Sequence, residues 1–250
     1  MNYYWNWGIF WQVSPDGAHT YLELLLDGAV WTIATAFSSW ILAFVLGSLV
    51  GVARTVPSPW IRRLASGYVD LFRNIPLLVQ MFLWYFVLPE LVPHAVGVWL
   101  KQMPNSSFYT AVVALGFFTS ARVAEQVRAG IMSLARGQLL AALALGLTLG
   151  QSYRYVLLPM GYRIILPPLT SEFLNIIKNS SVALTIGLLE LTASARAMSE
   201  FTFQTFEAFT AATIIYVVIA LLVTLAMRLV EGSVAVPGYL GARAVAAKVK

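Results

Sequence analysis

Five apolar runs follow one another along the chain and predict membrane-spanning helices. A helix needs roughly 20 mostly apolar residues to cross a hydrocarbon core of about 30 Å. The runs cover Gly28 to Ala53, Gly67 to Leu88, a segment that begins near Phe108 and thins out by Arg122, Ile164 to Leu189, and Ala208 to Met227. The pattern therefore predicts an all-α integral membrane fold with five transmembrane helices.

The stretch from Ala141 to Pro159, AALALGLTLGQSYRYVLLP, begins like a sixth span but is too short to be one. Its continuous apolar part, residues 139–150, has 12 residues, which make about 18 Å of helix. Cytoplasmic loops collect lysine and arginine, and here arginines lie on both flanks: Arg128, Arg136, Arg154 and Arg163. We therefore expect residues 129–163 to stay on the cytoplasmic side, between the third and fourth spans.

The remaining basic residues predict the orientation of the chain. The first 53 residues contain no lysine or arginine, and the two expected outer loops hold one base each, Lys101 and Arg196. The first inner loop and the C-terminal tail hold most of the others: Arg54, Arg62, Arg63, Arg228, Arg243, Lys248 and Lys250. This asymmetry predicts an N-out/C-in topology.

Three regions follow from this topology. Residues 1–27 are predicted to be a periplasmic interfacial segment, because Trp and Tyr favour the headgroup layer; a docking surface for an external partner is the alternative. Its aromatic residues are Tyr3, Tyr4, Trp5, Trp7, Phe10 and Trp11. Residues 28–228 form the expected transmembrane domain, with a cytoplasmic loop at about 135–160, and residues 229–250 form a cytoplasmic tail.

Composition supports a membrane protein without catalytic chemistry of its own. The chain is 59% hydrophobic and 11% charged, whereas soluble domains carry about 25% charged residues. Its net charge of +5 is spread between the apolar runs and forms no patch typical of nucleic-acid binding. There is no cysteine, no phosphate-binding Gly-Lys motif and no His-Glu-x-x-His. His19 and His94 fall in outer segments and are interpreted as solvated residues rather than metal ligands.

The fourth run carries the polar residues that most strongly suggest a substrate pathway. Ser171, Asn175 and Lys178 share one helical face, and Glu172, Asn175 and Asn179 share the neighbouring one. Because an ionisable group in a span costs about 2.5–3.5 kcal/mol, such groups usually line a cavity or find a partner. A pathway lining is favoured over a structural network, and the six-residue separation of Glu172 and Lys178 argues against direct pairing.

Two further sets of polar residues lie in the second and third runs. Asn74 and Gln80 are additional pathway candidates, next to Pro76, which is expected to kink the helix and free a backbone carbonyl. Arg73, Arg122 and Glu125 lie near the expected cytoplasmic ends of these spans and are interpreted as interface residues. Snorkelling is the ordinary explanation for Arg73.

An apolar loop outside the lipid needs a cover, and contiguous apolar surface usually marks a partner interface. A hairpin packed against the protein's own spans is an equally weighted alternative from composition. Gly146 is expected to terminate a helix, and Pro159 to end the following helix or start the next one.

The spacing of the loop is specific. The loop contains, in order, Ala-Ala, three residues, Gly, nine residues, an aliphatic residue, one residue and Leu-Pro. The matching positions are Ala141, Ala142, Gly146, Val156, Leu158 and Pro159. This pattern resembles the EAA loop of ABC importer permeases. Leu140 stands where that family has its leading glutamate, so any contact made by that carboxylate is absent.

Other stretches resemble the polar-amino-acid branch of the same family. They include residues 68–80, 125–138 and 167–181, although Ala135 stands where a proline is common. WNWGIF near the start, RTVP at 54–57 and VAVPG near the end look closest to its glutamate/aspartate permeases. The resemblance implies a permease subunit of an ATP-driven importer in the bacterial inner membrane.

The resemblance also implies partners and roles. The loop would form a coupling helix in a cleft of an ATPase, through Ala141, Ala142, Gly146, Leu158 and Pro159. A dimer of cytoplasmic ATP-binding subunits, a periplasmic substrate-binding protein, an identical or homologous permease and membrane lipid would be partners, with no nucleic acid. This chain would hold no cofactor, because ATP and magnesium would lie on the ATPase.

Two other classes of protein remain as alternatives. An ion-coupled secondary amino-acid transporter would need its own ion site and usually an internal repeat, and no repeated half is visible in the sequence. A membrane-anchored assembly protein would leave Glu172 and Lys178 without an explanation.

Overall fold

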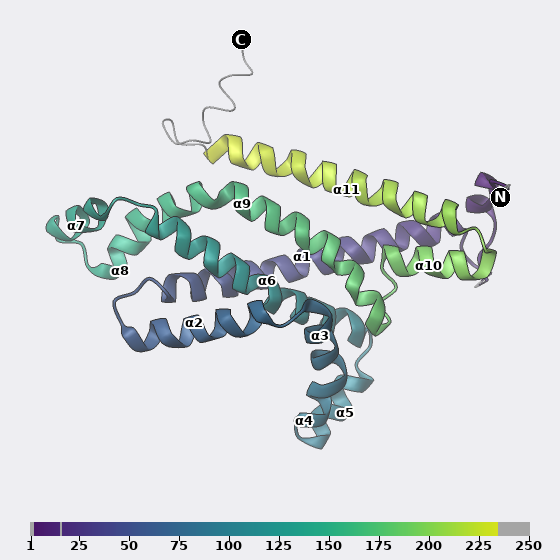
Figure 1. Ribbon diagram of the computed structural model, residues 1–250, viewed down its shortest axis with the longest axis horizontal. Coiled ribbons are helices and arrows are strands. Elements are labelled where there is room, and N and C mark those ends of the chain that lie inside the picture. The colour runs from purple at the N-terminus through teal and green to yellow at the C-terminus, as the bar shows by residue number, and fades with distance from the viewer. Residues whose placement is uncertain (1–2, 16, 235–250) are drawn as a thin grey trace, which may run out of the picture. The chain divides into compact units, whose positions relative to one another are not determined.

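The computed structural model describes residues 3–15 and 17–234, and the regular elements among them are helices (Figure 1). Most of the predicted C-terminal tail, including Arg243, Lys248, Lys250 and most of the VAVPG stretch, lies outside the described residues.

The α-helices are α1 (Tyr21–Ala53), α2 (Pro59–Asn74), α3 (Leu77–Phe82), α4 (Leu88–Leu91), α5 (His94–Gln102), α6 (Ser106–Met132), α7 (Arg136–Ala144), α8 (Leu149–Ser152), α9 (Leu158–Asn179), α10 (Leu191–Thr202) and α11 (Thr205–Val234). Short 3₁₀ segments are η1 (Trp7–Trp11) and η4 (Ser180–Ile186), and short π-helical segments are η2 (Leu83–Val87) and η3 (Tyr153–Leu157).

Three of these helices, α1, α6 and α11, are long and apolar enough to cross a membrane by themselves. The number of candidate spans rises to five if each of two bent pairs of helical segments is one span. These pairs are residues 59–74 with 77–91 and residues 149–186 with 191–202. The all-α multi-span class is thus confirmed. The N-out/C-in orientation and the boundaries of the three regions stay predictions.

The second span differs from the expected kinked helix, because it is interrupted at Ile75 and Pro76. Pro76 takes an extended conformation with ψ 142° immediately before α3, and it has no N–H to continue a helical ladder. The amide of Gln80 donates to the carbonyl of Ile75 at 2.9 Å. The amide of Asn74 donates to the carbonyl of Asp70 at 2.6 Å. Side-chain amides from both sides of the break therefore satisfy carbonyl groups before and at it.

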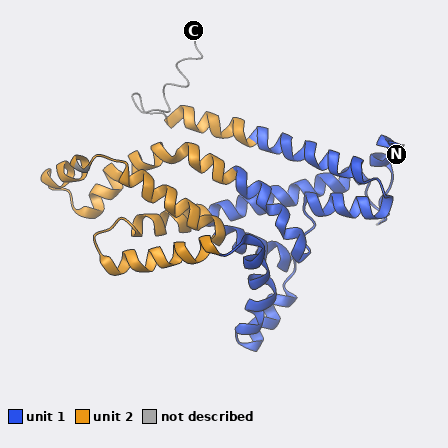
Figure 2. Cartoon of the chain, in the orientation of Figure 1, with its two compact units in different colours: residues 1–42, 75–116, 174–222 blue, residues 43–74, 117–173, 223–250 orange. Residues whose placement is uncertain are grey.

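The described chain divides into two compact units (Figure 2), of residues 1–42, 75–116 and 174–222 in unit 1 and residues 43–74, 117–173 and 223–250 in unit 2. In unit 1, α1 packs on the start of α10 where a glycine removes a side chain. A Cβ on Gly28 would lie 2.9 Å from the Cα of Leu191 and 2.5 Å from the hydroxyl of Ser194. Leu25 and Leu191 are fully buried beside this contact.

In unit 2, glycines again allow α1 to approach a second long helix, α6. A Cβ on Gly47 would lie 2.6 Å from the Cβ of Val123, and one on Gly51 would lie 2.7 Å from the Cβ of Val127. On another side of α6, the buried side chains of Val69, Ala121 and Ala124 form a core against which Val50, Tyr68 and Phe72 pack. Small residues at helix interfaces are the usual means of close packing in membranes.

We expect Gly47→Ala to lower the thermal unfolding midpoint of the purified protein, because the added carbon would also lie 2.7 Å from the carbonyl oxygen of Ser120. Overpacking of this kind costs about 1–3 kcal/mol. Gly67→Ala is the matched control, since no atom lies within 4 Å of the Cβ it would add on α2. That variant should leave the midpoint unchanged or raise it, because alanine is the better helix former. Equal midpoints for the two variants would contradict the packing described.

Candidate functional site

The loop that was predicted from its spacing is a pair of short helices with a tightly specified turn. After α7, Gly146 has a φ of +85°, in the left-handed region that glycine adopts without strain. Its N–H donates to the carbonyl of Leu143 at 3.0 Å, and the N–H of Leu147 donates to the carbonyl of Ala142 at 3.1 Å. These two bonds form a Schellman motif. The prediction that Gly146 terminates a helix is confirmed.

The second helix of the loop, α8, starts at a capping box. The backbone N–H of Gln151 donates to the hydroxyl of Thr148 at 3.3 Å, and the backbone N–H of Thr148 donates to the side chain of Gln151 at 2.8 Å. Reciprocal bonds of this kind fix the start of a helix. Because both the end of α7 and the start of α8 are fixed locally, the surface of the loop is preformed.

Four leucines of the loop are exposed rather than packed on the protein itself. Leu140 and Leu145 are 65% and 83% exposed, and Leu143 and Leu149 are also exposed. Ala142, in contrast, is buried. The protein's own helices therefore leave the leucine surface uncovered, which favours a partner interface over a hairpin packed on its own spans.

The other residues of the predicted motif flank this surface. Ala141 is exposed and Leu158 is partly buried. Pro159 is exposed and is the second residue of α9; because α8, η3 and α9 follow one another without a break, it neither ends nor starts a separate helix. The π-helical segment η3 lies between α8 and α9, and such segments are frequent at functional sites. The coupling role of these residues stays a prediction.

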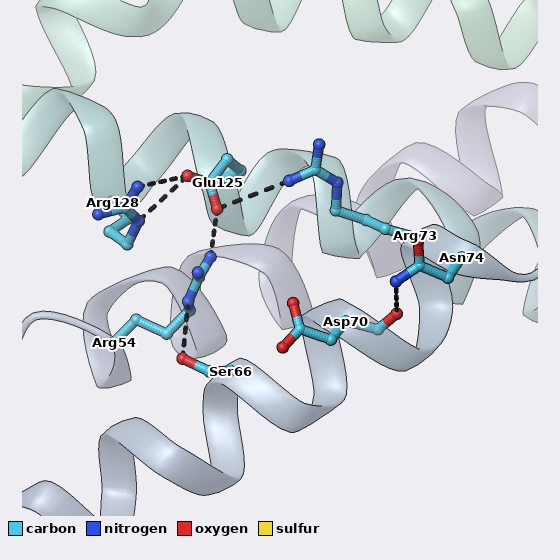
Figure 3. Close-up of polar contacts among 7 residues, drawn as sticks. All are labelled: Arg54, Ser66, Asp70, Arg73, Asn74, Glu125 and Arg128. Carbon is cyan, nitrogen blue, oxygen red and sulfur yellow. Dashed lines mark hydrogen bonds and ion pairs between the residues drawn. The ribbon is translucent and has the colours of Figure 1, made fainter.

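A cluster of charges in unit 2 surrounds the carboxylate of Glu125 on α6 (Figure 3). Arg128, one turn further along α6, donates to it through Nη2 at 2.5 Å and through Nε at 3.1 Å. Arg54, which follows α1, forms a second ion pair with it, and Arg73 near the end of α2 lies 3.9 Å from it. One carboxylate thus faces three guanidinium groups.

The Glu125 cluster also joins the segment that follows the loop. Arg54 is only 13% exposed, and its Nε lies 3.4 Å from the hydroxyl of Ser66 on α2. Its neighbour Thr55 accepts a 3.1 Å hydrogen bond from the hydroxyl of Tyr153, the first residue of η3. The cluster therefore connects the α1–α2 turn, α2 and α6 with η3, within one unit.

Sequence reasoning interpreted Glu125 as an interface residue and missed its partners. The Glu-x-x-Arg spacing of Glu125 and Arg128 was a usable signal, because residues three apart on a helix can pair. The contacts of Arg54 and Arg73 with the same carboxylate depend on tertiary packing.

The polar residues of α9 are placed differently from one another. Glu172 lies 3.9 Å from Arg122 of α6, and that guanidinium stacks over the ring of Phe118 at 4.9 Å. In the described part of the chain Glu172 thus pairs with a neighbouring helix and not with Lys178, as the six-residue separation predicted. This pairing gives Glu172 a structural role beside the predicted pathway role.

The other four pathway candidates on α9 are accessible to different degrees. Ser171 and Lys178 are exposed, while Asn175 and Asn179 are partly buried. Lys178 forms no ion pair with any residue in 3–15 or 17–234. The pathway role of these four residues stays a prediction.

The two candidates from the second span hold backbone groups. Asn74 and Gln80 bond to the backbone at the break described above, and Gln80 is buried. In this conformation both amides stabilise the interruption of the span, and a role in the pathway stays a prediction for them.

A cavity of about 820 Å³ in unit 1 contains none of the predicted pathway residues. Aromatic side chains dominate its lining, among them Trp84, Tyr85, Trp99 and Tyr109. The ion pair of Glu90 with Lys101 contributes its charged groups. This cavity and the polar positions of α9 are therefore separate features. Among the described residues, no group of three or more His, Asp or Glu side chains could hold a metal ion.

A buried carboxylate that the sequence analysis did not single out is Glu190 in unit 1. It caps α10 by accepting hydrogen bonds from the N–H groups of Thr192 and Ala193 at 3.0 and 2.8 Å. The hydroxyl of Tyr216 on α11 donates to it at 2.8 Å. A carboxylate at a helix N-terminus is stabilised by the helix dipole, so Glu190 has a sufficient structural role.

Comparison with known proteins gives one family and several relatives. Residues 43–236 match the model of the family described as binding-protein-dependent transport system inner membrane component. The chain is 50% identical over 246 residues to the glutamate/aspartate import permease protein GltJ of Escherichia coli strain K12, covering 97% of this chain and all of that protein. It is 33% identical to the probable glutamine ABC transporter permease protein GlnM of Bacillus subtilis, covering 84% and 92% of the two chains.

A solved structure also matches. The crystal structure of an amino acid ABC transporter with histidines superposes with a TM-score of 0.73 at 31% identity, covering 85% of this chain and 95% of that one.

Proposed function

The chain belongs to the family of binding-protein-dependent transport system inner membrane components, and we propose that it forms the membrane pathway through which an ATP-driven importer takes up glutamate and aspartate. It is a permease subunit of an ABC importer for amino acids and a multi-pass protein of the inner membrane. It is not an enzyme, because ATP hydrolysis in such importers belongs to a separate subunit. The ion-coupled alternative is not favoured.

One observation supports a role in energy coupling: the loop is preformed and exposes its leucines. Importers of this family work with an ATPase and a substrate-binding protein. We place a dimer of ATP-binding subunits, which would carry ATP and magnesium, against residues 135–160 on the cytoplasmic side. Leu140, where the family has a carboxylate, is itself exposed. Docking of this chain therefore rests on apolar contact and not on that charge.

The proposed substrate rests on the 50% identity to a glutamate/aspartate import permease. The relative whose name gives glutamine as the substrate, GlnM, has a lower identity of 33%. The more similar relative is therefore the one named for glutamate and aspartate. The exposed ammonium group of Lys178 supports an acidic substrate, because a cation in the pathway offsets the cost of removing water from the excess negative charge. A periplasmic binding protein would deliver the substrate, and an identical or homologous permease would complete the pathway.

One experiment tests the assignment as a whole. The tagged chain is expressed with the proposed ATPase, binding-protein and second permease subunits and purified in mild detergent. Separately, uptake of labelled glutamate and aspartate is measured in cells that lack other carriers for them. We expect an ATPase to copurify and uptake to depend on ATP. If no ATPase is retained and uptake follows an ion gradient, the importer assignment is wrong.

We expect Lys178→Met to reduce uptake of glutamate and aspartate well below wild type while the importer still assembles. The variant keeps the length and apolar stem of the side chain and removes only its charge. Lys178→Arg should retain part of the activity, because the charge remains while the geometry differs. Arg163→Met is a matched control on the same helix, because Arg163 is also an exposed base but lies in the stretch expected on the cytoplasmic side, and it should transport normally. Normal uptake by Lys178→Met would show that Lys178 is not a pathway residue.

A further inference from the structure

A series of aromatic rings joins the N-terminal segment to the start of α11, all within unit 1. Phe10 contacts Trp7 at 6.3 Å, Trp7 stacks on Trp5 at 5.4 Å, Trp5 contacts Phe206 at 6.0 Å, and Phe206 contacts Tyr3 edge-on at 4.7 Å. We call these five residues the aromatic cluster. Trp5, Trp7 and Phe206 are at least half exposed, so the cluster presents its rings to the surroundings.

Glu207 fixes this cluster to α11. Its side chain is fully buried, accepts the backbone N–H of Asn6 at 2.7 Å and also accepts the hydroxyl of Tyr3. The amide group of Gln204 lies 3.0 Å from that hydroxyl. No lysine, arginine or histidine in the described chain forms an ion pair with Glu207. Besides the amide of Gln204, the donors of this buried carboxylate are Tyr3 and Asn6 of the N-terminal segment, and a buried charge that loses such donors is costly.

The position of the cluster along α11 places it at a membrane boundary. Exposed apolar side chains run along α11 from Phe206 to Val230. The part that ends at Leu225, before the first exposed charge at Arg228, is about 28 Å of helix, close to the hydrocarbon thickness of about 30 Å. Phe206 thus lies where the hydrocarbon ends, and the rings that contact it lie in the headgroup layer.

The chemistry of the surface fits lipid better than a soluble protein. Residues 3–15 and 201–206 contain no charged side chain, whereas protein interfaces are normally bordered by a polar rim. Trp and Tyr favour the headgroup layer, which suits a flat ring with one polar atom. The cluster is also continuous with the exposed apolar face of α11.

The turn before α11 adds a further exposed ring. Phe203 is 85% exposed and has a φ of +59°, a left-handed conformation that is strained for a bulky residue. Strain at an exposed apolar residue is consistent with use of its side chain, and an apolar environment would cover this ring.

We propose that residues 3–11 are an interfacial anchor that Glu207 fastens to α11, with the phospholipid headgroup layer as its binding partner. The anchor holds the outer end of α11 at a constant depth in the membrane.

The absence of cysteine from the chain provides the test, because each introduced cysteine is unique in it. Nitroxide labels are attached at Tyr4→Cys and Phe203→Cys, both 85% exposed, and, as a control, at Arg62→Cys, an exposed position in the first inner loop. The complete importer is reconstituted in vesicles of phosphatidylethanolamine and phosphatidylglycerol, and the signal of the importer without these cysteines is subtracted. Accessibility of each label to oxygen and to a water-soluble nickel complex is then measured.

We expect the labels at positions 4 and 203 to favour oxygen over nickel and to report a depth of about 5–10 Å below the surface, while the label at 62 favours nickel. Glu207→Gln should shift the label at 4 to the ratio seen at 62. Tyr3→Phe, which removes one donor and keeps the ring, should shift it part of the way and covers the case in which the first variant does not assemble. A label at 4 that favours nickel in the unmodified importer, or becomes shielded only when binding protein is added, would overturn the proposal. An unchanged ratio in an assembled Glu207→Gln importer would overturn the role of Glu207.

Discussion

Gly146→Asp is expected to abolish transport while the protein still inserts into the membrane. The residue lies in the turn between α7 and α8, beside the exposed Leu145. In the proposed complex, the added carboxylate would be buried in apolar contact with the ATPase. An unpaired buried charge costs at least roughly 2 kcal/mol, which corresponds to about a 30-fold loss of affinity. Copurification of the ATPase and uptake of labelled substrate measure the effect.

Gly146→Asn is the matched control for this result. Asparagine has nearly the same size and tolerates a positive φ about as well as aspartate does, so the two variants differ chiefly in charge. We expect Gly146→Asn to retain most of the ATPase. Loss of the ATPase from both variants would point to the turn geometry, and normal uptake by Gly146→Asp at normal expression would refute the coupling role of the loop.

Glu125→Ala is expected to be the most destabilising substitution in unit 2. It leaves Arg54, Arg73 and Arg128 without their shared carboxylate, and the side chain of Arg54 is only 13% exposed. Removing one partner from a buried ion pair costs about 3–5 kcal/mol; Glu125 itself is 28% exposed, so we expect the lower part of that range. The measurement is the thermal unfolding midpoint of the importer in detergent, with the amount of assembled complex as a second readout.

Glu200→Ala tests whether this loss is specific. Glu200 pairs with Arg196 at 2.7 Å on α10, but both side chains are 61% exposed, and exposed pairs of this kind contribute little to stability. The midpoint should therefore stay close to wild type. Similar, small changes in both variants would mean that the Glu125 cluster is solvated and does not hold unit 2 together.

Several elements of the protein were predictable because they depend on local chemistry. The long apolar runs of α1 and α11 need no tertiary information, since helix length and hydropathy decide whether a segment can cross lipid. Gly146 was placed correctly at a helix end because a positive φ acts within one or two residues. The spacing around the loop also indicated the family before any contact was known.

The second span shows where local reasoning was incomplete. Pro76 was expected to kink a helix, yet the helix ends before it and a new one begins after it. The side chain of Gln80 accounts for the difference, because it supplies the hydrogen bond that the carbonyl of Ile75 would otherwise lack. A polar residue that looked like a pathway candidate in the sequence thus stabilises the break.

By itself the sequence determined the class of the protein, its apolar runs, the loop between α6 and α9 and the resemblance to importer permeases, because all of these depend on composition and spacing along one chain. Only the tertiary structure decided which charges meet. Glu125 collects arginines that lie 71, 52 and 3 positions away, and Glu207 binds Asn6 across 201 positions. Ion pairs and hydrogen bonds act over a few ångströms of space, whatever the separation in sequence, so only the packing of the helices could bring these partners together.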